Sequence, residues 1–575
     1  MNGKGAFIVQ KKWWMESVGY QIYPKSFFDA NGDGIGDLLG IIEKLDYLKD
    51  LGVNMVWICP FYDSPMDDNG YDVKNFFEVN PLFGTMEDAK RLIHEAHERG
   101  IKIVLDYVLN HTSDEHPWFI ESRSSKENPY RDYYIWHEGK FKDGKKVEPT
   151  NWGSFFGGSA WKYDEITDSY FMKIFSDKMP DLNWKNPDVQ QAMIDVAKTW
   201  LSYGVDGFRI DAVSHLDRAP FIDIEDNHGE EFPLDWHKFS NLPKVHDYLN
   251  ILYQEVFKPY DCLSIGEVGG AASIDSGLMY SAFDRNELSM VFNFDHNWCN
   301  NLHDVYHPKK LKTNVKQLKD VFNRWQQAFY LKGWLPLNWL NHDQPRLISH
   351  YGSIKYPKAS GKMLATALHM MRGTPFIYQG EEIGMTNFRF DDVSQFDDVS
   401  SIANYRYHLK KEPDNPNGAL LKAAMTSRDN ARTAMQWSKD YQAGFTTGKS
   451  IPLINPNYKK INVDEQLNDS SSLWYHYQKL ISLRRFSNYK DVIVYGTYEQ
   501  IDMDSDVFYN YLRKNDEHTL LIINSFKNKK TTYDVSGYEI LDTLISNYDK
   551  TIIKNNTLHL KPYESLVFKV KEIKR

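Results

Sequence analysis

Residues 205–213 read VDGFRIDAV, a short apolar run that ends with Arg209 and Asp211. Three further runs have the same design: IKIVLDYVLNH at 101–111, LSIGEVGG at 263–270 and PLNWLNHDQ at 336–344. Parallel strands are buried on both faces, so they read as apolar runs. In a closed parallel barrel the carboxyl ends of the strands meet at one mouth. The four runs therefore predict a single site, built from charged residues at the ends of several barrel strands.

The spacing of these runs fits an eightfold barrel with additions. One strand–helix unit takes about 30 residues, and Asp211, Glu267 and Asp343 follow one another at intervals of one to three units. Asp106 and Asp211 lie more than three units apart, so we expect an inserted domain between them. Apolar runs and helical patterns in the rest of the chain predict further strands near 18–23, 54–60, 291–295 and 373–384, and helices at 40–52, 91–100 and 185–204.

The expected fold class is α/β: a (β/α)8 TIM barrel with an inserted subdomain after strand 3 and a C-terminal antiparallel β domain. Residues 1–108 form the first part of the barrel and residues 109–180 the inserted domain. Residues 181–490 form the second part, with a further polar insertion at about 386–460, which is too long for an ordinary loop. Short β-rich runs bounded by turn residues fill 491–575 and predict a β-sandwich.

Composition excludes several classes of partner. The net charge is −10 and the pI is about 6.0, so the chain has no basic footprint for nucleic acid. No run approaches the roughly 20 apolar residues of a membrane span, and the N-terminal segment is a poor signal peptide. Three cysteines without CxxC spacing predict a reducing compartment. We therefore expect a cytoplasmic protein that binds neither nucleic acid nor membrane.

Two of the strand-end residues suit acid–base chemistry. Arg209 and Asp211 are two apart on a strand, so their side chains share a face, and the arginine lowers the pKa of the aspartate. That aspartate could act as a nucleophile. Glu267 follows an apolar run, and burial would raise its pKa toward that of a general acid. Such a pair could cleave a glycosidic bond; the alternative is a structural ion pair.

The loop DANGDGIGD, residues 29–37, predicts a cation site. Side-chain oxygens recur at Asp29, Asn31, Asp33 and Asp37, and Gly34 allows a sharp turn, as in the first nine positions of an EF-hand loop. Position twelve is Gly40 instead of the bidentate glutamate, so the loop is not an EF-hand. Oxygen ligands favour Ca²⁺ or Mg²⁺. The alternative is a polar turn without a metal.

The motifs together resemble a known family. DYVLNH, GFRIDAV, GEV and NHDQ are similar to the four signature regions of the α-amylase family of glycoside hydrolases. QIYPKSFFDANGDGIGDL, NWGSFFGGSAW and SRDNARTAMQW resemble its oligo-1,6-glucosidase and α-glucosidase branch, and the similarity covers nearly the whole chain. The resemblance implies that Asp211 is the nucleophile, Glu267 the acid/base and Asp343 the transition-state stabiliser.

The same resemblance implies how substrate and metal are held. It assigns the non-reducing glucose to Asp72, His111, Arg209 and His342, with Tyr71 stacked beneath it. Arg428 would pair with Asp72 and close the pocket, which makes an exo-acting enzyme. The implied metal is a structural Ca²⁺, with Mg²⁺ possible, and the Ile35 carbonyl completes its ligands.

We therefore expect a retaining exo-α-glucosidase that releases glucose from short α-1,4 and α-1,6 glucooligosaccharides. Ala212 stands where α-1,6-specific members usually carry valine, and Met179 stands where they carry glutamine. The alternatives are oligo-1,6-glucosidase proper and a glucosyl-transferring or trehalose-6-phosphate-hydrolysing sibling. A non-catalytic transporter heavy chain would have a membrane helix and would lack the carboxylates. Linkage preference, transfer against hydrolysis and oligomeric state stay open.

Overall fold

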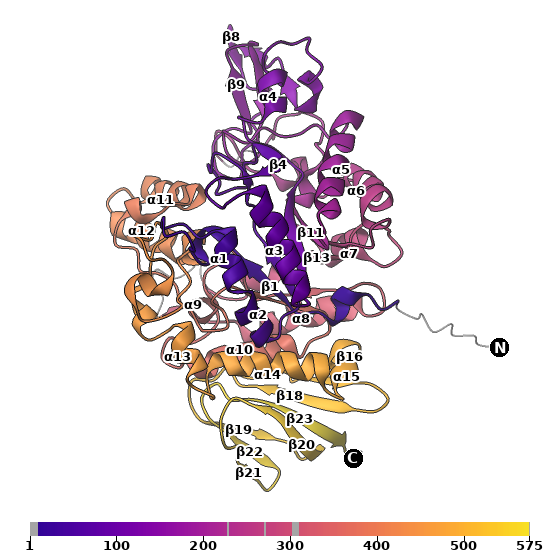
Figure 1. Cartoon of the computed structure of the whole chain (residues 1–575), viewed down its shortest axis with the longest axis vertical. Coiled ribbons are helices and arrows are strands. Elements are labelled where there is room, and N and C mark those ends of the chain that lie inside the picture. Colours follow the sequence, from indigo (N-terminus) through magenta and orange to yellow (C-terminus); the bar gives the residue numbers. More distant parts are fainter. Residues whose placement is uncertain (1–9, 227–228, 270–271, 302–309, 574–575) are drawn as a thin grey trace, which may run out of the picture.

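The computed structural model describes residues 10–226, 229–269, 272–301 and 310–573. Residues 1–9 and 574–575 of the predicted terminal domains, and Gly270 in the third quoted run, lie outside this range. A parallel barrel forms the centre of the molecule (Figure 1). Its strands are β1 (Gly19–Ile22), β2 (Met55–Ile58), β5 (Lys102–Val108), β11 (Gly207–Asp211), β12 (Leu263–Glu267), β13 (Met290–Phe292), β14 (Pro336–Leu337) and β15 (Thr374–Tyr378).

These eight strands follow one another around the barrel in chain order, and the paired neighbours are parallel. The first and last strands of the hydrogen-bonded sheet, β13 and β14, also lie in contact. The predicted (β/α)8 fold is confirmed, and each expected strand is present. The register positions the site: Arg209 on β11 lies opposite Asp106 on β5.

The helices outside the barrel begin and end where the sequence signals them. α3 (Met86–Glu98) begins with a capping box between Thr85 and Asp88. α5 (Pro187–Ser202) has Asn186 as its N-cap and proline at its first turn. The helix predicted at 40–52 is instead two helices, α1 (Leu38–Glu43) and α2 (Leu45–Leu51), because Lys44 leaves the helical conformation.

An insertion between β5 and α5 forms the small lobe at the top of Figure 1. It contains α4 (Pro117–Ser122) and an antiparallel sheet of β6 (Trp136–His137), β10 (Ser169–Met172) and β9 (Trp161–Asp164). A hairpin of β7 (Lys140–Lys142) and β8 (Lys145–Val147) extends from it. Trp152, Trp161 and Met172 form its core, so this expected subdomain is present.

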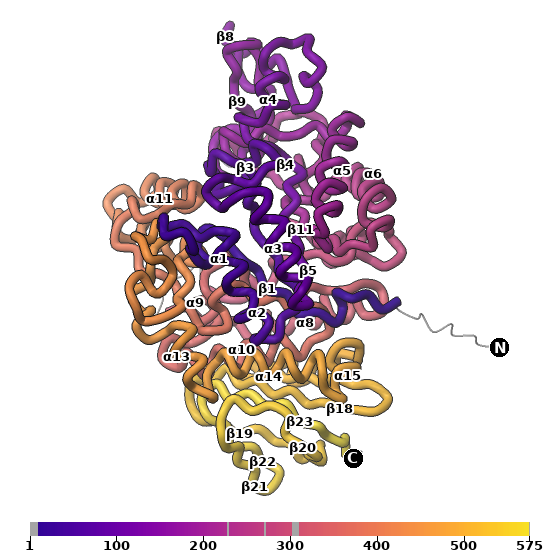
Figure 2. The backbone as a smooth tube through the Cα atoms, viewed as in Figure 1, coloured from indigo at the N-terminus to yellow at the C-terminus, as the bar shows by residue number. Residues whose placement is uncertain are grey.

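The polar insertion after β15 is helical. α11 (Val399–Lys411) and α12 (Pro416–Thr426) pack against each other as a hairpin. The apolar side chains of Phe390, Phe396 and Ala423 form its small core. Figures 1 and 2, drawn from the same side, show the hairpin at the left of the molecule.

The C-terminal part is antiparallel, as expected. After α14 (Leu473–Phe486) and α15 (Lys490–Val494), one sheet has the order β16 (Thr497–Ile501), β17 (Asn510–Lys514), β18 (Thr519–Asn524), β23 (Ser565–Glu572), β20 (Tyr538–Ser546). The second has the order β19 (Thr531–Asp534), β22 (Thr557–Leu560), β21 (Ile553–Lys554). The domain boundaries at 108, 180 and 490 stay predictions. Within the described ranges, no helix has both the length and the apolar character needed to cross a membrane.

Candidate active site

A cavity of about 700 Å³ opens where the barrel strands end. It brings together most of the residues predicted from the sequence: Tyr71, His111, Asp211, Glu267, Asp343 and Arg428. These side chains come from widely separated parts of the chain, and the barrel places them together because the carboxyl ends of its strands share one rim. The apolar rings of Phe155, Phe156, Phe175 and Trp236 line the same cavity.

Arg209 organises the carboxylates from below. Its side chain is 1% exposed and is not among the cavity-lining residues. One terminal nitrogen donates to Asp106 at 2.5 Å and to Asp211 at 2.7 Å, and the other donates to Glu267. Arg209 therefore orients the two predicted catalytic carboxylates, where the family resemblance had assigned it to the sugar.

The carboxyl groups of Asp211 and Glu267 have different pKa values. Burial raises the pKa of Asp211 to about 6, although Arg209 opposes the shift. Burial raises the pKa of Glu267 to about 8, and the negative charges of Asp211 and Asp343 add to the rise. The expectation that Arg209 would lower the Asp211 pKa below its usual value is wrong, because desolvation outweighs the arginine. The order of the two values still leaves the proton on Glu267 at neutral pH.

Asp211 and Glu267 lie close enough for a hydrogen bond between their carboxyl groups. An inverting glycosidase needs about 6.5–9.5 Å between its carboxyls to hold a water, whereas a retaining one needs about 5–5.5 Å. A separation of this kind is nearer to the retaining distance than to the inverting one. The arrangement suits direct attack by one carboxylate while the other donates a proton.

Asp343 has the opposite environment. Burial alone would raise its pKa, but His342, Arg428 and Arg432 hold that pKa well below its usual range. Burial lowers the pKa of His342 to about 3, so this ring is neutral near pH 7. The two arginines therefore keep Asp343 ionised at that pH. Arg432 bonds to Asp343 at 2.7 Å and Arg428 lies 3.4 Å from it.

Arg428 lines the cavity, but its partner is not Asp72. It pairs with Asp68 at 2.8 Å and also with Asp398 and Asp343. Asp72 is fully buried and does not line the cavity. Its carboxylate accepts hydrogen bonds from the Ser64 hydroxyl and from the backbone of Asp67 and Asp68. The predicted Asp72–Arg428 pair is therefore wrong.

The local backbone explains which aspartate reaches the cavity. Asn69 and Gly70 both have positive φ, 52° and 103°, so the chain between Asp68 and Asp72 makes a tight turn. Glycine adopts this conformation without a steric penalty, and asparagine tolerates it. The turn directs Asp68 to the cavity and folds Asp72 back onto its own loop.

His342 and Tyr71 form one side of the site. Their rings stack at 5.3 Å with an interplanar angle of 8°. The Gln21 amide donates to Nδ1 of His342, so the proton lies on Nε2, which is 2.7 Å from the Tyr71 hydroxyl. The Tyr71 hydroxyl in turn lies 3.3 Å from Asp106. This chain fixes the face of Tyr71 that borders the cavity.

His111 presents an N–H donor at the cavity. The Asn110 amide donates to its Nδ1, and Asn110 is held by Arg218 through its oxygen. The proton therefore lies on Nε2, which makes no hydrogen bond of good geometry to a described residue, although the Tyr71 carbonyl is close to it. Burial lowers the pKa of His111 to about 4, so the ring is neutral at pH 7. A buried donor that is poorly satisfied within the protein suits a substrate hydroxyl.

The loop 29–37 is the cation site predicted from the sequence. Asp29 accepts from the backbone of Gly32 and Gly34, and Asp37 accepts from that of Ala30 and Asn31. Burial raises the pKa of Asp37, partly offset by its hydrogen bonds, and Asp29 adds to the rise. Neighbouring carboxylates with oxygen-rich surroundings fit a divalent cation.

The carboxylates of this loop do not suffice by themselves. Among the described residues, no group of three or more His, Cys, Asp or Glu side chains could hold a metal ion. A cation here would therefore also need the Asn31 amide oxygen and the Ile35 carbonyl, beside Asp29, Asp33 and Asp37. This ligand set is the one that the sequence predicts.

Comparison with known proteins shows the family to which this chain belongs. The model of the alpha amylase catalytic domain matches residues 21–496, and that of the alpha-amylase SusG C-terminal domain matches residues 509–567. The chain belongs to the α-amylase family of glycoside hydrolases.

Among individual relatives, the oligo-1,6-glucosidases of Bacillus cereus and Parageobacillus thermoglucosidasius are 44% and 45% identical, over 98% of this chain and 100% of each relative. The solved trehalose-6-phosphate hydrolase of Bacillus licheniformis superposes with a TM-score of 0.88 at 40% identity, covering 98% of this chain and 100% of that one.

Three charged residues of the site were missed by the sequence reasoning. Asp68 stands within DDNGYDV, residues 67–73, and Arg432 within the quoted SRDNARTAMQW. The sequence predicts Asp72 in place of Asp68 in the first motif. In the second motif it predicts Arg428 alone. Asp398 belongs to the second insertion, where no motif marks it. Its position next to the helix-forming stretch that starts at Val399 was the only available signal, because aspartate is a favoured N-cap.

Proposed function

We propose that this chain is a retaining exo-α-glucosidase that releases glucose from the non-reducing end of short α-1,4 and α-1,6 glucooligosaccharides. The observation that carries the proposal is the set of ion pairs that joins Arg428 to Asp68 and Asp343 at the cavity wall, which would close one end of the cavity. A chain passing through an open cleft would be cut internally. A cavity with one closed end accepts only the end of a chain.

The proposed reaction depends on the raised pKa values of Asp211 and Glu267. Asp211 attacks the anomeric carbon while Glu267 protonates the leaving oxygen, which gives a glucosyl–enzyme ester and the shortened sugar. Glu267, now ionised, takes a proton from water, and that water breaks the ester and frees glucose with retained configuration. Asp343, held ionised by Arg428 and Arg432, would bond to sugar hydroxyls most strongly in the transition state.

The cavity argues against a phosphorylated substrate. Of the described residues that line it, Arg428 is the only lysine or arginine, and carboxylates already surround it. Burial keeps His111 and His215 neutral at pH 7, with pKa values lowered to about 4 and about 3. Among the described lining residues, a 6-phosphate group would meet carboxylates and no lysine or arginine other than Arg428. We therefore favour a neutral glucooligosaccharide over trehalose 6-phosphate.

The linkage proposal depends on Ala212. This residue lines the cavity, follows the nucleophile and has a left-handed backbone with φ of 46°. Valine would place two more methyl groups beside the sugar that leaves. One or two methylenes in an apolar pocket change substrate preference by about 1–3 kcal/mol. We infer that α-1,4 bonds are cut at useful rates beside α-1,6 bonds, with oligo-1,6-glucosidase proper as the second candidate.

Initial rates on maltose, isomaltose, sucrose, trehalose and trehalose 6-phosphate test this assignment directly. We expect turnover of maltose and isomaltose, and little or none of trehalose 6-phosphate. Isomaltose turnover without maltose turnover would favour oligo-1,6-glucosidase proper. Rapid turnover of trehalose 6-phosphate alone would refute the proposal.

We also propose that the loop 29–37 holds a structural Ca²⁺, for which Mg²⁺ could substitute, and that the protein works in the cytoplasm. The acidic and amide oxygens described above support the cation, whose contribution would be to stability, since an ion that binds only the native state raises stability by mass action. The cysteine count supports the location. That the protein binds neither nucleic acid nor membrane stays a prediction.

A further inference from the structure

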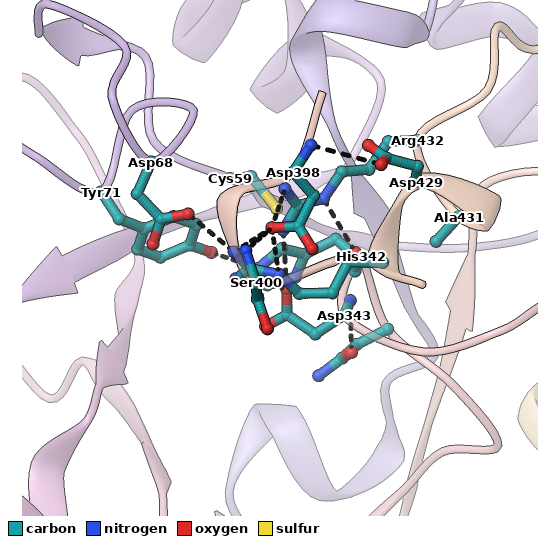
Figure 3. A network of polar contacts seen from close by, with 12 residues as sticks. Cys59, Asp68, Tyr71, His342, Asp343, Asp398, Ser400, Asp429, Ala431 and Arg432 are labelled. Atoms are coloured by element: carbon teal, nitrogen blue, oxygen red, sulfur yellow. Dashed lines mark hydrogen bonds and ion pairs between the residues drawn. The ribbon is translucent and has the colours of Figure 1, made fainter. Parts of the chain in front are cut away.

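The Asp398 carboxylate lies outside the cavity and bonds to Arg428, which lines it. Asp398 is fully buried and does not line the cavity. It accepts hydrogen bonds from both Nε and Nη2 of Arg428, the former at 2.8 Å, and Nη1 of Arg432 lies 3.9 Å from it. Figure 3 shows Asp398 in one network with Asp68, Asp343 and Arg432. Asp398 therefore holds the Nε and Nη2 edge of Arg428, while Nη1 faces Asp343 and Nη2 also reaches Asp68.

The same carboxylate begins helix α11. Asp398 is its N-cap and accepts from the backbone of Ser400 at 3.3 Å and Ser401 at 2.8 Å. The Ser401 hydroxyl bonds to Asp398 at 2.6 Å and to Ser427 at 2.8 Å. Ser427 is the residue before Arg428, so the α11–α12 hairpin is tied to the cavity at both of its ends. An N-cap side chain stabilises a helix, and its loss weakens the first turn.

The hydrogen bonds to Asp398 determine how the Arg428 guanidinium is oriented. A guanidinium donates in a planar fork, so bonds along one edge determine where the remaining donors point. With Nε occupied by Asp398, Nη1 and Nη2 reach Asp343 and Asp68. Removing one partner of a buried ion pair leaves the other charge uncompensated. Without Asp398, Arg428 and Arg432 would lose this shared partner and turn toward the cavity carboxylates.

We propose that Asp398 is a positioning residue that couples the folded α11–α12 hairpin to the blind end of the cavity, and so to the affinity for the terminal glucose. The inference depends on the proposed function, because it assumes that the blind end receives glucose. Asp398 touches no substrate; it acts through Arg428 and Arg432. The hairpin is then part of the glucose site, although none of α11 lines the cavity.

The first test compares Asp398→Asn with Ser401→Ala. Asparagine is as good an N-cap as aspartate, so Asp398→Asn removes the charge and keeps the helix start. We expect it to raise both the KM for maltose and the dissociation constant of glucose about tenfold, with kcat changed less than about threefold, the pattern of lost ground-state binding. Ser401→Ala removes a helix contact without changing any charge, and should lower the melting temperature while leaving KM within about twofold. A folded Asp398→Asn protein with unchanged glucose affinity would overturn the proposal.

The second test needs no variant. Hydrogen exchange of the wild-type enzyme, measured with and without saturating glucose, reports local opening of helices. We expect glucose to slow exchange at the start of α11, near Ser400 and Ser401, and to leave the distant helix α3 unchanged. If glucose slows exchange around the cavity but not in α11, the coupling is wrong. If glucose does not bind at all and maltose and isomaltose are not hydrolysed, the proposed function itself has failed.

Discussion

The pH dependence of kcat/KM should report the two displaced carboxyl groups. Glu267 must hold its proton to act as the acid, so activity falls as the pH rises through its pKa of about 8. Asp211 must be ionised to attack, so activity falls as the pH drops through its pKa of about 6. One pH unit beyond either value leaves about a tenth of the enzyme in the active form. We therefore expect kcat/KM at pH 5 and at pH 9 to be about tenfold below its value at pH 7.

The assay measures initial rates on isomaltose at concentrations well below KM, with circular dichroism at each pH as a check on folding. α-Glucosyl fluoride is the matched control, because fluoride leaves without a proton from the enzyme. On this substrate the acid limb should remain and the alkaline limb should disappear. The two groups are coupled, so the limbs give the apparent pKa values of the pair. An alkaline limb of equal size on both substrates would refute the role of Glu267.

Four further changes test other parts of the site. Asp211→Asn and Glu267→Gln should each lower kcat on isomaltose by several orders of magnitude at an unchanged melting temperature; a fully active Asp211→Asn enzyme would exclude its role. Arg428→Ala should weaken glucose binding in calorimetry by at least about tenfold, and unaltered affinity would contradict the closed-end account. Chelation should lower the melting temperature of the wild type more than that of Asp33→Asn, and identical shifts would argue against the cation. Ala212→Val should raise the isomaltose-to-maltose rate ratio and cost about 1–2 kcal/mol of stability, since valine is strained at φ of 46°. Ala212→Gly is the unstrained control. An unchanged rate ratio in Ala212→Val would show that residue 212 does not determine the linkage preference.

The barrel and its charged rim could be predicted because their signals are local. A run such as residues 205–213 carries its own strand pattern, and parallel topology then requires its end to meet the ends of the other strands. Asp211, Glu267 and Asp343 follow from this rule alone. The contacts of Arg209 with Asp211 and Glu267, and its place between β5 and β12, depend on the register.

The details that failed depend on conformation or on distant parts of the chain. Asp68 and Asp72 both belong to one short motif, and only the left-handed turn at Asn69 and Gly70 decides which one reaches the cavity. The pKa of Asp211 depends on how much water the surrounding domain excludes, which a neighbouring arginine in the sequence does not reveal. Asp398 meets Arg428 only because the helical hairpin folds back on the barrel.

One measurement tests the central claim most directly: proton NMR of the products formed from maltotetraose in the first minutes of reaction. A retaining enzyme with a closed cavity should release α-glucose first, together with maltotriose, and β-glucose should appear only later by mutarotation. β-Glucose as the first product would contradict the assignment of Asp211 as nucleophile. Maltose as the main early product would contradict the closed cavity on which the proposed function depends.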